Sequence, residues 1–74
     1  MNYDIDTAEG MANSVAWMEG VLFSGEAPIL VWYVPRSGAT YTIDKVSKIY
    51  YSDWVDSSID RVLDHMGFKK ERFQ

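Results

Sequence analysis

The stretch ILVWYV-PRSG-ATYTI, residues 29–43, decides the fold of this chain. Ile29–Val34 is apolar throughout, which is typical of a central strand that is covered on both faces. In the intervening PRSG, Pro35 fixes one backbone angle and Gly38 accepts a positive φ, so a tight turn is predicted. Ala39–Ile43 then predicts a returning strand. Together these residues predict an antiparallel hairpin.

A helix is predicted on each side of the hairpin. Residues 7–23 carry apolar side chains at helical spacing, with Asp6 as the N-cap and Glu9 completing a capping box. Residues 53–66 repeat this spacing. Gly67 follows them at the position where a helix C-terminus favours a residue with positive φ.

The fold class follows from the order of these elements. Residues 45–51 fit either a third strand or a helical turn, and their β-branched and aromatic side chains favour the strand. We therefore expect an α+β domain of order α-β-β-(β)-α, in which a short antiparallel meander packs against two helices. The expected domain covers residues 1–74, with fraying over 1–5 and 69–74.

The charge is unevenly distributed along the chain. Net charge is −4, from 7 basic and 11 acidic residues. Residues 1–35 contain five acidic residues and no Lys or Arg, whereas residues 36–74 contain seven basic and six acidic residues. This asymmetry indicates an acidic face and a weakly basic face. We expect the partner to be another protein with a basic surface rather than a nucleic acid.

The composition limits the cellular compartment that we expect and the kinds of site that the chain can contain. There is no cysteine, so disulfides and thiolate zinc sites are excluded. The apolar run over residues 29–34 is far shorter than the roughly 20 residues of a membrane span. The N-terminal residues lack the basic region of a signal peptide. We expect a cytoplasmic protein without membrane attachment.

The first predicted helix has an unusual polar face. Opposite its apolar stripe, a large Trp stands among small side chains, which is typical of a binding interface. The residues of this face are Gly10, Asn13, Trp17 and Gly20. The face could meet a foreign protein or a second copy in a homodimer. The alternative is a helix that is buried on both sides, with Trp17 in a second core patch.

The second predicted helix carries a row of carboxylates beside its apolar face. The row consists of Asp53, Asp56, Asp60 and Asp64. Like charges at this spacing destabilise a helix slightly, so the row is a candidate acidic ridge for a cationic partner. The alternative is an ordinary solvated face. A metal site is not expected, because helix-borne aspartates rarely complete an oxygen shell.

A second candidate surface belongs to the basic second half of the chain. Cations interleaved with tyrosines are typical of single-stranded nucleic-acid binding. The candidate residues are Arg36, Lys45, Lys48, Tyr50, Lys69 and Lys70. The alternative is a Tyr-rich packed sheet with scattered solvated lysines.

The sequence contains no phosphate-binding loop, metal-ligand spacing or nucleophile motif. We therefore expect no catalytic residue, no cofactor and no enzyme activity. The prediction is a small acidic binding protein, an inhibitor or adaptor that occupies a basic site on its partner. Proteins of this class are often encoded by phages or mobile elements and include inhibitors of host defence. The alternatives are a nucleic-acid-binding regulator and a structural homodimer subunit.

Overall fold

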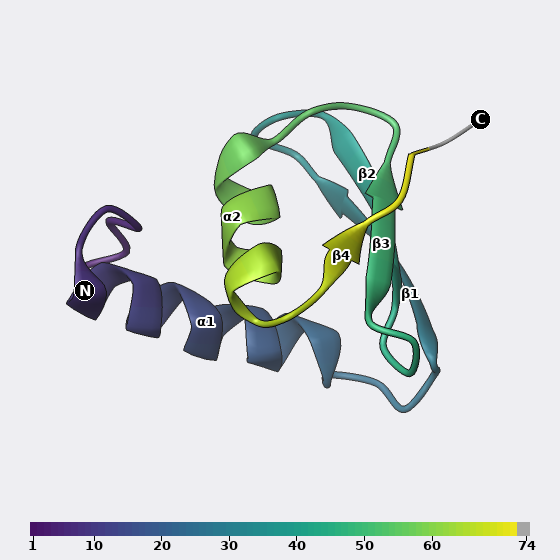
Figure 1. Cartoon of the computed structure of the whole chain (residues 1–74), viewed down its shortest axis with the longest axis horizontal. Coiled ribbons are helices and arrows are strands. Elements are labelled where there is room, and N and C mark those ends of the chain that lie inside the picture. The colour runs from purple at the N-terminus through teal and green to yellow at the C-terminus, as the bar shows by residue number, and fades with distance from the viewer. Residues whose placement is uncertain (73–74) are drawn as a thin grey trace.

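The computed structural model describes residues 1–72 and confirms the α+β class. The described elements, in chain order, are α1 (Ala8–Leu22), β1 (Ile29–Val34), β2 (Ala39–Asp44), β3 (Ile49–Ser52), α2 (Ser57–His65) and β4 (Lys69–Lys70). Both helices lie on the same side of the sheet (Figure 1). The predicted fraying of residues 73–74 lies outside the described part.

The four described strands form one sheet of order β1-β2-β3-β4. β1 and β2 are antiparallel, as are β2 and β3, whereas β4 runs parallel to β3. The predicted hairpin is confirmed: Val34 pairs with Ala39, and Gly38 in the turn has φ 77°. The predicted meander is therefore present, with β4 added at its far edge.

The core lies between the helices and the inner face of the sheet. The largest fully buried side chains are Tyr41, Met18, Leu22, Ile43 and Leu63. The opposite face of β1 is open, where Ile29, Val31 and Tyr33 are exposed. The prediction that residues 29–34 form a central, doubly covered strand is therefore wrong, because β1 is an edge strand with helices on one side.

The segment between β2 and β3 is a turn rather than the start of a strand. The Asp44 carboxylate accepts hydrogen bonds from the backbone N–H groups of Val46 and Ser47, each at 3.0 Å. Lys48 has φ 58°, an uncommon value for a residue with a side chain. The third strand is confirmed, but it begins only at Ile49.

Both helices begin at a residue other than the predicted one. Thr7, not Asp6, is the N-cap of α1, and its hydroxyl accepts a hydrogen bond from Gly10 N–H at 3.0 Å. α2 starts at Ser57, because Asp53 is hydrogen-bonded across the sheet to Thr40 of β2 and Asp56 takes the N-cap position. The helix end at Gly67 is confirmed, with φ 92°.

Both segments that the sequence predicts to fray, 1–5 and 69–72, make hydrogen bonds to the rest of the domain. Asn13 donates a hydrogen bond to the Asn2 carbonyl oxygen at 2.7 Å, which ties the N-terminal segment to α1. Lys69 N–H donates to the Lys48 carbonyl and Glu71 N–H to the Tyr50 carbonyl, so this segment joins the sheet. Neither helix of the described chain is long and apolar enough to span a membrane.

Candidate functional site

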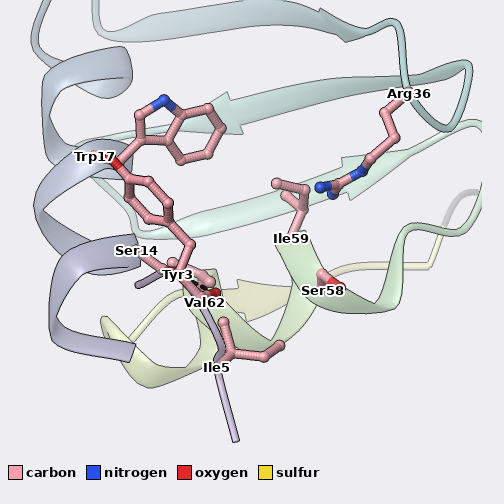
Figure 2. A pocket seen from close by; sticks show the side chains of 8 residues that line it. All are labelled: Tyr3, Ile5, Ser14, Trp17, Arg36, Ser58, Ile59 and Val62. Carbon is pink, nitrogen blue, oxygen red and sulfur yellow. Dashed lines mark hydrogen bonds between the residues drawn. The ribbon is translucent and has the colours of Figure 1, made fainter. Parts of the chain in front are cut away.

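A hollow of about 330 Å³ opens where α1, α2, the β1–β2 turn and the N-terminal segment meet. Figure 2 shows side chains from all four segments around it. We call it the Trp17 hollow, and its lining consists of Tyr3, Ile5, Ser14, Trp17, Arg36, Ser58, Ile59 and Val62. Apolar and aromatic groups dominate this lining, with one cation and two serine hydroxyls among them. Such a mixture is typical of a site that receives an apolar group in a fixed orientation.

Trp17 stands at the wall of this hollow and is 44% exposed. Its ring lies against Trp32 of β1, with centroids 5.6 Å apart and planes inclined by 60°. Trp32 in turn contacts Tyr41, and Tyr41 contacts Tyr50. Trp17 therefore combines both sequence interpretations, because it extends an aromatic row of the core and still presents a large apolar surface to solvent.

The N-terminal segment forms one wall of the Trp17 hollow. Ser14 donates a hydrogen bond to the Tyr3 carbonyl oxygen at 3.3 Å, shown in Figure 2. The segment passes so close to α1 that a Cβ on Gly10 would lie 1.8 Å from the Asp4 carbonyl oxygen. The prediction that Gly10 belongs to an open face is wrong, because Gly10 is buried under this segment.

The rest of the predicted α1 face is only partly open. Asn13 is half-buried beside the N-terminal segment, whereas Gly20 is exposed toward the other end of the helix. The residues that accompany Trp17 are therefore those of the hollow rather than its helical neighbours. Sequence reasoning missed Tyr3, Ile5 and Trp32, since no local pattern brings these residues to α1.

Arg36 closes the hollow on the side of the β1–β2 turn. Its guanidinium donates to the Asp56 carboxylate at 3.1 Å. Asp56 is 7% exposed and caps α2 by accepting the Ile59 N–H at 3.2 Å. Burial by itself raises the pKa of Asp56, but hydrogen bonds from Ile59, Ser37 and Arg36 outweigh it and lower the pKa overall.

The aspartate row of α2 is not an unoccupied acidic ridge. Asp53 accepts the Thr40 N–H at 2.7 Å, and Asp56 is the buried N-cap. Asp60 accepts a hydrogen bond from the Tyr41 hydroxyl at 2.6 Å and forms a salt bridge with Lys70 at 2.8 Å. Asp64 alone in this row is exposed with a carboxylate that forms no hydrogen bond or salt bridge with residues 1–72. Three of the four carboxylates thus hold the fold together.

Two buried tyrosines lie close enough to these carboxylates for the negative charge to raise their pKa values. Burial, the hydrogen bond to Asp60 and its negative charge raise the pKa of Tyr41 far above its ordinary value. Burial, together with the charges of Asp60 and Asp64, raises the pKa of Tyr50 to about 12. Both phenols therefore stay neutral at physiological pH and serve as buried hydrogen-bonding groups of the core.

The residues of the candidate nucleic-acid surface do not form one open track. Tyr50 is buried, so it offers no ring for base stacking. Lys45 donates to the Leu22 carbonyl at 2.6 Å and thereby caps α1. Arg36 and Lys70 are paired with aspartates, Lys48 lies 5.7 Å from the Phe68 ring centre, and Lys69 is exposed on β4.

The acidic residues of the first half of the chain are all exposed. Asp6 is paired with Arg61 at 2.9 Å. The other four form no salt bridge with any residue of the described chain, and they are Asp4, Glu9, Glu19 and Glu26. Asp4 lies between Tyr3 and Ile5 in the chain, and its carboxylate accepts a hydrogen bond from the Asp6 N–H at 3.0 Å.

No three His, Cys, Asp or Glu side chains of residues 1–72 converge as metal ligands. No protein-family model, curated protein or solved structure matches this chain.

Proposed function

We propose that this protein is a non-enzymatic binding protein, an inhibitor or adaptor, that receives an apolar side chain of a partner protein in the Trp17 hollow. The observation that carries the proposal is the half-exposed Trp17, held by Trp32 at the wall of an open, largely apolar hollow. Trp is enriched among the side chains that dominate binding energy, especially where a rigid contact orients it.

Charge supports a basic partner. Asp4 is the chain neighbour of Tyr3 and Ile5, which line the hollow, and the acids without a salt bridge give residues 1–35 an exposed negative charge. A partner segment that places Lys or Arg beside its apolar anchor fits this surface and would be attracted to it over a distance. Binding through such exposed charges weakens with salt, because the Debye length falls to about 10 Å at 0.1 M ionic strength.

A selection from displayed random peptides tests the proposal. The selected peptides should carry a large apolar residue next to Lys or Arg, and calorimetry then gives their affinities for the folded protein. Trp17→Ser should weaken binding by about tenfold or more, as expected for an interface hot spot. Tyr3→Ala, which removes another wall of the hollow without changing the Trp17–Trp32 contact, should weaken binding in the same direction.

Trp54→Ser is the matched control. Trp54 is 66% exposed, more so than Trp17, and it does not line the hollow. This variant should bind the selected peptides like the wild type. If the control loses as much affinity as Trp17→Ser, or if both hollow variants keep full affinity, the Trp17 hollow is not the binding site.

A further inference from the structure

β1 leaves a set of backbone hydrogen-bonding groups without a partner strand. Lys45 N–H donates to the Pro28 carbonyl, and Asp53 N–H donates to the Thr40 carbonyl. Together with the β1–β2 and β2–β3 registers, these two bonds show which way each backbone group of β2 points. The N–H and C=O groups of odd-numbered residues of β2 point toward β1, and those of even-numbered residues point toward β3. The backbone N–H and C=O groups of Ile29, Val31 and Tyr33 therefore point outward from the sheet edge.

The same three residues also present their side chains on the open face of the sheet. The chain carries no charge from Ala27 to Pro35. Edge strands of monomeric proteins are ordinarily protected by charges, by a bulge or by short length. The opposite edge is protected in this way, because β4 has two residues and both are lysines. β1, with six uncharged residues, has none of these protections along its length.

We propose that β1 pairs antiparallel with β1 of a second copy of this chain, which joins two sheets into one. The two-fold register sets Val31 opposite Val31 and Ile29 opposite Tyr33. In this register each of these pairs exchanges two backbone hydrogen bonds, so every outward group of β1 finds a partner. Pro35, which has no N–H, and Pro28 bound the paired stretch.

The number of paired groups favours the same register. Shifting the two strands by two residues leaves one outward residue in each copy without a partner within β1. The rest of the molecule, with net charge −4, disfavours self-association, whereas the uncharged β1 does not.

The pairing also accounts for the composition of β1. The run Ile-Leu-Val-Trp-Tyr-Val is rich in β-branched and aromatic residues, which gain from side-chain contacts with a neighbouring strand. In the single chain β1 has only β2 beside it. In the dimer β1 becomes a central strand, and the Val31 side chains of the two copies pack together on the shared face. This inference does not depend on the Trp17 hollow.

Spin labelling tests the register directly. The chain has no cysteine, so one Val31→Cys substitution carries one nitroxide per copy. The two labelled residues should lie opposite each other, with Cα atoms about 5.5 Å apart, and broaden the EPR spectrum strongly. The control is Val46→Cys, at a 79% exposed position in the β2–β3 turn. Antiparallel pairing places the two turns at opposite ends, so this spectrum should stay narrow.

A charge at the two-fold axis tests the energetics. Val31→Lys should raise the dissociation constant of the dimer by about tenfold or more, because like charges directly opposite each other destabilise a strand pair. The matched control is Thr42→Lys, on the same face of the neighbouring strand, where Thr42 is the cross-strand partner of Val31. This control should keep the wild-type constant. Sedimentation equilibrium measures all three proteins.

Two results would overturn the proposal. One is a monomeric mass of the wild type at the highest concentration measured. The other is a dimer in which the Val31 labels show no coupling, since that dimer uses another surface, such as the α1 face around Trp17. Circular dichroism of each variant verifies that a lost dimer does not reflect a lost fold.

Discussion

Two glycines of α1 have opposite surroundings, although both interrupt the same helix. Gly10 lies under the N-terminal segment, where an added Cβ would meet the Asp4 carbonyl oxygen at 1.8 Å. Gly20 has no neighbouring heavy atom within 4 Å of such a Cβ. Glycine lowers helix stability relative to alanine because it loses more backbone entropy on folding. Only at Gly10 does the structure give a reason for that loss.

We predict that Gly20→Ala raises the free energy of unfolding by about 0.5–1 kcal/mol. Gly10→Ala should lower it by about 1–3 kcal/mol, because the new methyl group must displace the backbone of the N-terminal segment. Urea denaturation at constant m-value measures both. A stabilising effect of Gly10→Ala would contradict the close approach of Asp4 to α1.

The candidate site was only partly predictable at the level of single residues. The spacing of the first helix placed Trp17 away from the apolar stripe, and its exposure agrees with that. The same spacing placed Gly10 on an open face, because periodicity describes one helix and contains no information on a segment that folds back over it. Trp32 and Tyr3 contact or accompany Trp17 only through the tertiary arrangement.

At the level of elements, the β1–β2 hairpin and the C-terminal end of the second helix were the most predictable features. The bounds of β1 and the helix end at Gly67 follow from local signals, an apolar run and a residue that accepts positive φ. The start of α2 was misplaced because Asp53 and Asp56 are equally good N-cap residues by type, and only the pairing of Asp53 with Thr40 separates them. β4 was missed because two lysines carry no strand pattern.

The N-cap of α2 gives a prediction on pH dependence. The lowered pKa of Asp56 means that the folded state favours its carboxylate form. This contribution to stability is fully present above the unfolded pKa of about 3.9, and it is lost as the pH falls through the lower folded value. Asp56→Asn keeps a capping oxygen but removes the charge and its pairing with Arg36.

The variant should therefore be less stable than the wild type at pH 7, by about 1 kcal/mol because Arg36 is largely exposed. The difference should shrink as the pH falls below about 4. Asp56→Ala should cost more at pH 7, about 1–2 kcal/mol, since it also removes the cap. Urea unfolding across this pH range measures each difference. A difference that stays constant from pH 7 to the acid limit would show that the charge of Asp56 contributes nothing.

At the scale of the whole molecule, a chain of 74 residues has little surface to bury, and such small domains often gain stability by association. Pairing through β1 buries additional surface of each chain. It leaves unchanged the helical side of the sheet, where the Trp17 hollow lies. A dimer that unfolds to separate chains melts at a temperature that rises with protein concentration. The wild type and Thr42→Lys should therefore show melting temperatures that increase over a concentration series, whereas the melting temperature of Val31→Lys should begin to increase only at about tenfold higher concentration or more. Differential scanning calorimetry of the three proteins measures this, and a wild-type melting temperature independent of concentration would mean that β1 remains an unpaired edge.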